Sequence, residues 1–109
     1  MPQKIDNQRK IKSLADIAQH ADEAAQMLKS LANEHRLLIL CQLSAGECSV
    51  GELNERIPLS QSALSQHLSV LRREMFVTTR RESQTIYYDL AKGPATRVIK
   101  LLHDIYCKQ

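Results

Sequence analysis

The residues most able to do chemistry lie between positions 60 and 75, where one helical face is polar. Amide and hydroxyl side chains come first on this face, at Gln61, Ser62, Ser65 and Gln66. Gln can bond adenine at two points and Ser can bond donors or acceptors on base edges, so these residues predict readout of DNA bases. No acid precedes Glu74 in the stretch. A solvated helix face usually mixes Glu with Lys, whereas a face without acids suits a helix pressed against a polyanion.

Cations and a histidine extend this predicted DNA surface. Phosphate contacts are expected from Arg72 at the helix end and from Arg80 and Arg81 just beyond it, with Gln84 reaching toward the minor groove. The alternative for the arginines is an ordinary solvated surface, and their clustering argues against it. His67 has two open interpretations, a phosphate contact or packing beneath the helix.

Local signals place this stretch on a helix. Pro58 cannot continue a preceding helix and forces a turn. Ser60 is suited to the N-cap, because its hydroxyl can accept from a free backbone N–H of the first turn. Behind it a single apolar stripe recurs at helical spacing, at Leu64, Leu68, Leu71 and Met75.

Three further helices are predicted before this one. From 13 to 31, Ala and Leu recur at helical spacing, which suits a helix packed closely on another, within the chain or in a second subunit. Asn33 caps a second helix with a nearly continuous apolar run, so we expect it to be the most buried. Ser49 and Glu52 form a capping box that opens a short third helix. Helix, short turn and helix is the helix-turn-helix pattern, whose second helix enters the major groove.

The hydrophobic period changes after the polar helix. Segments 76–81 and 85–90 roughly alternate and are rich in β-branched and aromatic residues, which predicts a β-hairpin with a polar tip. Gly93-Pro94 ends the strand pattern, and 95–106 forms a last amphipathic helix. Five helices with a two-stranded hairpin wing between the fourth and fifth predict a mainly α (α+β) winged helix-turn-helix.

Length and composition limit the chain to one domain of 109 residues. We expect residues 1–12 to be a flexible basic arm, alternatively one that touches DNA phosphates, and residues 13–109 to be the folded domain. The net charge of +3 permits nucleic-acid binding without arguing for it. No long apolar run or signal-peptide region is present, so we expect a cytoplasmic protein without membrane contact. No nucleophile–base pair, metal triad or phosphate loop is visible, and an enzyme is not expected.

Three cysteines remain as reactive groups, Cys41, Cys48 and Cys107. An odd number in a cytoplasmic chain is not a disulfide framework, which leaves free thiols, metal ligands or redox sensors. On the residues alone, small buried hydrophobes are the favoured interpretation of Cys41 and Cys107. Cys48, in a loop near a helix start, is interpreted as a spectator.

Three runs of the sequence carry a family resemblance, LKSLANEHRLLILCQL, SVGELNERIPLSQSALSQHLSVLRRE and TTRRESQTIYYDL. Together they resemble the ArsR/SmtB family of bacterial repressors, over residues 27–107. The family's recognition helix of the type S-x-S-x-x-S-x-H-L appears at Ser60, Ser62, Ser65, His67 and Leu68. Within the family, ILCQL around Cys41 and IYCKQ around Cys107 resemble the sulfur-responsive branch of BigR-, SqrR- and HlyU-like repressors.

The resemblance implies a homodimeric transcriptional repressor that pairs through its first and last helices. Such proteins bind a short inverted repeat in double-stranded operator DNA and release it when an inducer acts. The sulfur-responsive branch implies a persulfide or polysulfide inducer, sensed by Cys41 and Cys107 through a disulfide or polysulfide bridge. No cofactor is implied.

Two departures from the family pattern bear on this interpretation. A Gly usually follows the recognition helix, and Met75 in its place predicts an exit turn of different shape. The family's thiolate metal motif, E-L-C-V-C-D-L, matches residues 47–53, where Ser49 and Gly51 occupy both ligand positions.

Other functions stay open on the sequence. A metal-responsive repressor of the same fold would use His103 and Asp104, but a full site needs about four ligands and we predict no metal ligands. A redox-insensitive regulator of the same fold is a second alternative. A winged-helix module used only for protein contacts is a third, and the acid-free polar face argues against it.

Overall fold

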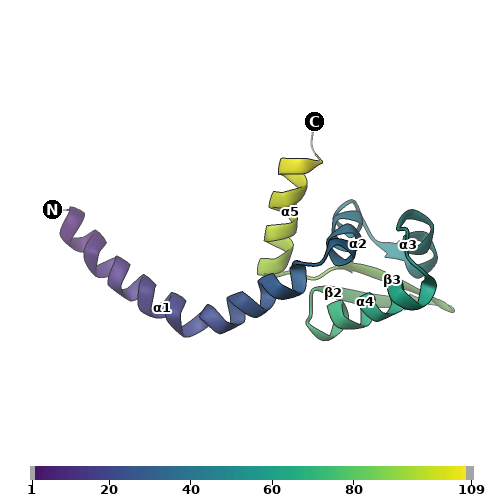
Figure 1. Cartoon of the computed structure of the whole chain (residues 1–109), viewed down its shortest axis with the longest axis horizontal. Coiled ribbons are helices and arrows are strands. Elements are labelled where there is room, and N and C mark those ends of the chain that lie inside the picture. The colour runs from purple at the N-terminus through teal and green to yellow at the C-terminus, as the bar shows by residue number, and fades with distance from the viewer. Residues whose placement is uncertain (1, 108–109) are drawn as a thin grey trace.

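The structure is a winged helix-turn-helix with one long helix extending from its body (Figure 1). This computed structural model describes the backbone of residues 2–107 and the side chains from residue 14 to residue 107. In chain order the elements are α1 (Pro2–Leu31), α2 (Glu34–Ser44), β1 (Cys48–Ser49), α3 (Val50–Arg56), α4 (Gln61–Arg73), β2 (Val77–Glu82), β3 (Thr85–Leu90) and α5 (Pro94–Tyr106). The predicted five helices and hairpin wing are confirmed.

Polar caps start the three central helices where the sequence predicted them. The side chain of Asn33 accepts from the backbone N–H of Arg36 at the start of α2. Ser49 and Glu52 form the reciprocal capping box at the start of α3, and Ser60 accepts from the N–H of Ala63 in α4. Each cap satisfies a donor that the helix leaves unpaired, which fixes where the helix begins.

The wing is part of a three-stranded antiparallel sheet with strand order β1-β3-β2. The sequence predicted the hairpin of β2 and β3 but not β1, whose two residues, Cys48 and Ser49, pair with Tyr88 and Tyr87. A two-residue strand is too short to show alternation, so it left no pattern in the sequence. The hairpin turns at residues 83–84, where Ser83 takes a positive φ of 58°.

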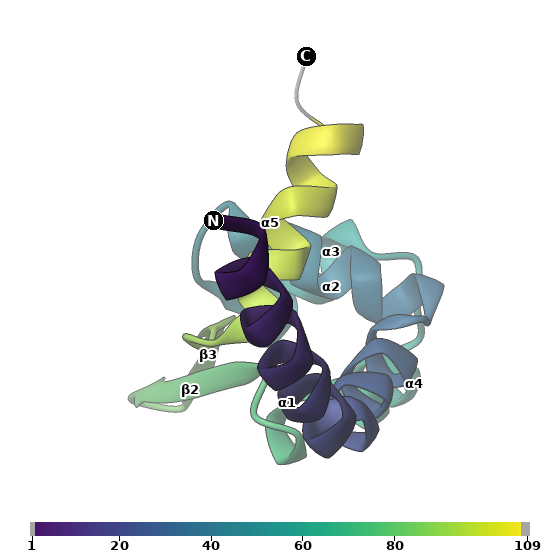
Figure 2. The ribbon, with the colours of Figure 1, turned by 90° about the vertical axis from the view of Figure 1, so that its left-hand side faces the viewer.

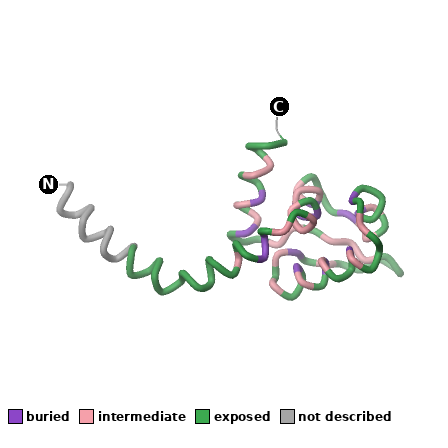
Figure 3. The backbone as a smooth tube through the Cα atoms, viewed as in Figure 1, coloured by how far each residue is buried: buried purple, intermediate pink, exposed green. Residues whose placement is uncertain are grey.

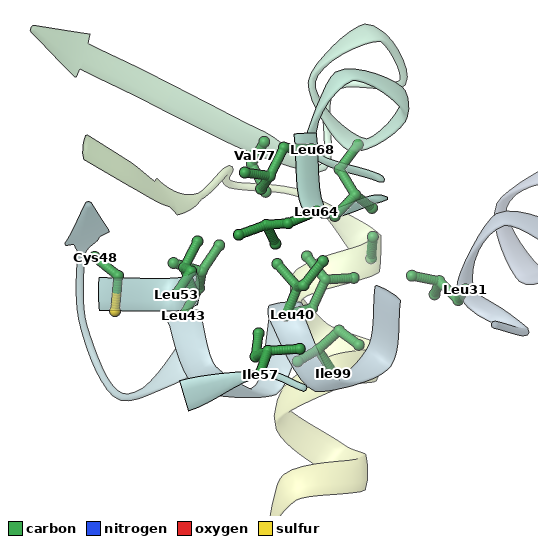
Figure 4. Packing of buried hydrophobic residues seen from close by; sticks show 13 residues of the cluster. Leu31, Leu40, Leu43, Cys48, Leu53, Ile57, Leu64, Leu68, Val77 and Ile99 are labelled. Carbon is green, nitrogen blue, oxygen red and sulfur yellow. The ribbon is translucent and has the colours of Figure 1, made fainter. Parts of the chain in front are cut away.

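The core lies between α4, α2, α5 and the sheet (Figure 4). The predicted stripe of α4 is confirmed at three positions, since Leu64, Leu68 and Leu71 are almost fully buried. They meet Leu40 and Leu43 of α2, Val77 of β2 and Ile99 of α5. Met75, the fourth member of the predicted stripe, is 78% exposed because the helix has already ended.

Helix α1 begins at Pro2, well before the predicted start at Ser13, and runs away from the body (Figures 1 and 2). The side chains of the predicted basic arm, residues 1–12, lie outside the described residues. The described part of α1 is largely exposed (Figure 3), including Leu14, Ile17 and Leu28. Within residues 2–107 no helix is long and apolar enough to span a membrane.

The exit from α4 is a Schellman turn built on a non-glycine residue. Glu74 is the C-cap, and Met75 follows it in the left-handed region with a φ of 64°. The N–H of Phe76 bonds the carbonyl of Leu71, and the N–H of Met75 bonds that of Arg72. Replacing the usual Gly with Met therefore leaves the turn in its ordinary shape, contrary to the sequence-based prediction.

Met75→Gly should raise the free energy of unfolding by about 0.5–1 kcal/mol. The left-handed conformation costs a residue with a Cβ about 1–2 kcal/mol, and Gly avoids this strain. The greater conformational entropy of Gly in the unfolded chain offsets part of the stabilisation. Met75→Ala is the matched control, because it removes the side chain but keeps the Cβ. Chemical denaturation of the three proteins measures the difference, and equal stability of the Gly and Ala variants would contradict strain at this turn.

Candidate nucleic-acid interface and thiol pair

The outer face of α4 carries the predicted base-reading residues together. Gln61, Ser62, Ser65 and Gln66 are all exposed, and Ser62 and Gln66 lie on the side of the helix opposite the buried leucines. The hydroxyl of Ser62 lies 3.3 Å from that of the N-cap, Ser60. The face thus offers amide and hydroxyl groups along the first two turns of the helix, where a recognition helix contacts base edges.

His67 lies beneath this face rather than on it. Its Nδ1 accepts a hydrogen bond from Nε of Arg36 at 3.4 Å, and its ring centroid is 5.8 Å from that of His35. Burial, then the charge of Arg36, then His35, lower the pKa of His67 from its ordinary value. This placement corresponds to the packing interpretation of His67.

Arg80 is held by two carboxylates of its own chain. Its guanidinium bonds both oxygens of Glu47 at 2.7 and 2.8 Å and one oxygen of Glu82 at 2.7 Å. It also stacks on the ring of Tyr87, 4.5 Å from the centroid. The hydrogen bond from Arg80 lowers the pKa of Glu47, so the pair stays ionised. The structure therefore places Arg80 in a network that fixes the wing to the loop before β1, whereas the sequence predicted a phosphate contact.

Arg81 points to the other side of the sheet. Successive side chains of a strand alternate, so Arg81 shares a face with Val77, which packs in the core against α4. Arg81 is exposed and makes no ion pair within residues 14–107. Arg72, in the last turn of α4, and Gln84, in the hairpin turn, are exposed as well. These three residues remain available to DNA.

Two of the three thiols lie on helices that pack against each other, α2 and α5. Cys41 is half-buried on α2 and contacts the core, and Cys107 is the exposed C-cap of α5. Burial raises the pKa of Cys41, and the charge of a Cys107 thiolate raises it further. The fold therefore brings into electrostatic interaction two residues that are far apart in the sequence.

Cys48 stands apart from this pair, inside the core. Its Sγ lies 3.7 Å from the carbonyl of Gly46 and accepts a hydrogen bond from Arg56 at 3.5 Å. Burial is the largest effect and raises the pKa of this thiol, while Arg56 acts in the opposite direction. Among the described residues, no group of three or more His, Cys, Asp or Glu side chains could hold a metal ion.

Sequence reasoning missed the residues that hold the functional side chains in place. Arg36 beneath α4, Glu47 against the wing and Ser30 against the end of α4 all act across long sequence separations. Arg36 and Glu47 read as ordinary surface charges in the sequence. Since no local spacing links them to their partners, only the folded chain reveals the pairs.

Comparisons with known proteins agree with this geometry. The sequence model of the arsR family of bacterial regulatory proteins matches residues 33–79. The transcriptional activator HlyU of Vibrio cholerae is 49% identical over 96 residues, which cover 88% of this chain and 89% of that protein. The biofilm growth-associated repressor of Agrobacterium fabrum is 45% identical over 94 residues, with 86% and 80% covered.

A solved structure shows the same fold at similar identity. Reduced HlyU from Vibrio cholerae N16961 is 50% identical and superposes with a TM-score of 0.79, covering 84% of this chain and 97% of that chain. The winged helix-turn-helix, the exposed polar face of α4 and these likenesses lead to one conclusion: the chain belongs to the arsR family of bacterial regulatory proteins, which are transcriptional regulators.

Proposed function

We propose that this regulator is a dimeric repressor that senses persulfides or polysulfides through Cys41 and Cys107 and releases its operator on oxidation. The observation that carries the proposal is the packing of α2, which holds Cys41, against α5, whose C-cap is Cys107. The charge of a Cys107 thiolate also acts on Cys41. One of its relatives is named an activator and another a repressor. A protein that releases its operator on oxidation would act as a repressor. One relative is described in a reduced form, in accord with thiol chemistry.

The dimer is supported by apolar faces that have no partner within the described chain. On α1, Leu14, Ile17 and Leu28 are more than half exposed, and so are Leu101, Ile105 and Tyr106 on α5. Apolar area of this extent is costly in water, and a second copy would cover it on both helices. A two-fold dimer presents two α4 helices, which fits an inverted repeat with half-sites about one DNA turn apart.

The environments of the two thiols assign their roles. Cys107 is exposed, so its thiolate can reach the sulfane sulfur of a persulfide, RSSH, take that sulfur and release the thiol RSH. Cys41 then attacks the Cys107 sulfur, forms the disulfide and expels hydrogen sulfide. In sum, two thiols and RSSH give one disulfide, RSH and hydrogen sulfide. Cys41 suits the second step, because burial raises its pKa and leaves less thiolate to react first.

A Cys41–Cys107 bridge would change DNA binding through geometry. It joins α2 to the end of α5, the helix whose outer face we assign to the dimer interface. A shift of α5 moves the two protomers, and with them the two α4 helices, relative to each other. Since half-site spacing is fixed by the DNA, a small change of that distance lowers operator affinity.

Treatment with a persulfide donor should abolish operator binding and produce a Cys41–Cys107 bridge, read by gel shift and by intact mass. Cys41→Ser should instead accumulate the persulfide on Cys107 without a bridge and keep its affinity. Cys48→Ser is the matched control and should respond as the unaltered protein does. Unchanged binding in the donor, together with loss of binding on zinc addition, would favour the metal-responsive alternative.

Gln66→Ala should weaken operator binding by about 1–3 kcal/mol and leave affinity for random DNA nearly unchanged, because Gln66 is assigned to a base edge. Titration of both DNA duplexes measures the two affinities. Ser69→Ala, another exposed position of α4 outside the base-reading set, serves as the control. Equal losses on the two duplexes would remove Gln66 from base readout.

Arg81→Ala should reduce the salt dependence of DNA affinity by about one unit of slope per protomer, as loss of one phosphate contact does. Arg80→Ala should leave the slope unchanged, since the Arg80 guanidinium is already occupied by Glu47 and Glu82. Binding measured across a series of salt concentrations separates the two. The reverse pattern would mean that Arg80 leaves its carboxylates when DNA binds.

A further inference from the structure

A chain of polar contacts joins the end of α1 and the start of α2 to the recognition helix. The hydroxyl of Ser30, which is buried, donates to Oε1 of Glu74 at 2.6 Å at the end of α4. Arg36 bonds the carbonyl of Ser30 at 3.2 Å through Nη1 and Nδ1 of His67 at 3.4 Å through Nε. One guanidinium therefore touches the last turn of α1 and the middle of α4.

These polar contacts fix the rotation of α4 about its axis, which the buried leucines do not. The stripe of Leu64, Leu68 and Leu71 holds α4 against the core, but apolar contacts have little directional preference. A hydrogen bond weakens steeply when its angle changes, so Arg36 and His67 oppose rotation of α4 about its own axis. Such a rotation would turn Gln66, the neighbour of His67, away from the DNA.

The contact at His67 depends on its protonation. In this contact Nδ1 accepts a hydrogen bond from Nε of Arg36, which requires a neutral ring whose Nδ1 carries no hydrogen. A protonated imidazolium has no acceptor, and it would face the cation of Arg36 and the second imidazole, His35, both from α2. Glu74, the carboxylate in this chain of contacts, accepts from the Ser30 hydroxyl at the end of α4. Burial, Arg36 and His35 all disfavour a charge on His67.

We propose that Arg36 is a positioning residue for operator binding, acting through neutral His67, and that protonation of His67 frees the recognition helix and lowers operator affinity. Burial and the charge of Arg36 hold the pKa of His67 below its usual value, in accord with a ring that is neutral near pH 7. The sign follows from linkage. The His67 ring binds a proton more readily when α4 is released than when the Arg36–His67 contact holds it. The contact is therefore intact above about pH 6.5, the usual histidine value, and is lost as the pH falls below it.

The proposal rests on operator binding alone and is independent of the thiol chemistry. It opposes the other interpretation of His67 as a phosphate contact, because a phosphate ligand would bind DNA more tightly when protonated. The two therefore predict pH effects of opposite sign at one residue.

The test uses His67→Asn, compared with the unaltered protein on one operator duplex from pH 8 to pH 5. The amide oxygen of Asn takes the place of Nδ1, accepts from Arg36 and does not titrate. At pH 8 the two proteins should bind within about twofold of each other. At pH 5 the unaltered protein should bind more weakly than the variant, because only the unaltered protein has a residue 67 that can be protonated.

Two further variants make the outcome specific. Arg36→Gln should weaken operator binding at pH 8 and flatten its pH dependence, because it removes the donor of the contact that protonation of His67 would break. His20→Asn is the control for histidine titration elsewhere, since His20 is exposed on α1 and pairs with Glu23. It should follow the unaltered protein at every pH.

Either of two results would overturn the proposal. One is an affinity ratio of unaltered protein to His67→Asn that stays constant with pH, and the other is a ratio that rises as the pH falls. Absence of operator binding by both proteins at pH 8 would instead contradict the DNA-binding function itself. Circular dichroism at each pH, with random DNA as a second duplex, separates loss of the fold from loss of the helix position.

Discussion

Burial of the three leucines of α4 is the constraint on which the DNA surface depends. Leu64, Leu68 and Leu71 occupy one side of the helix and fill the space between α2, α5 and the sheet, so the opposite side must face solvent. Each leucine contributes about 1.5–3 kcal/mol by leaving water. The outward direction of the polar side chains between them therefore follows from the core, which determines which residues are free to meet DNA.

Helix α2 connects the two activities that we propose. Its middle is the most buried helix segment of the chain, with Ile39, Leu40 and Leu43 almost fully covered. Its first turn reaches α4 through Arg36, and its last turn carries Cys41. The helix also packs against α5. A covalent bridge at Cys41 therefore acts on the same rigid element that positions the recognition helix. Tightly packed helices move as units, so a displacement at one end of α2 is felt at the other.

The sequence predicted the elements whose signals are local and missed the contacts that cross between them. Caps at Asn33, Ser49 and Ser60, the leucine stripe and the hairpin all follow from spacings of a few residues, and the structure confirms each. The occupation of Arg80 by Glu47 has no such signal, because residue type gives a charge and not its partner. At the exit turn of α4 the sequence predicted an altered shape, and this prediction was wrong. Two backbone hydrogen bonds hold the ordinary turn and keep Met75 in a conformation that its Cβ disfavours.

Neither of the two regulatory sites that we propose, the thiols and His67, is placed in contact with the DNA. The thiols lie on α2 and at the end of α5, and His67 lies behind the exposed polar face of α4. In both proposals these residues act on DNA affinity through distance and orientation. In the dimer that we propose, each protomer reads one half-site, and the contacts of α1 and α5 set the spacing between the two copies of α4. The exposed apolar residues of these helices would then be as much a part of operator selection as the glutamines of α4, because a rigid duplex accepts only one spacing.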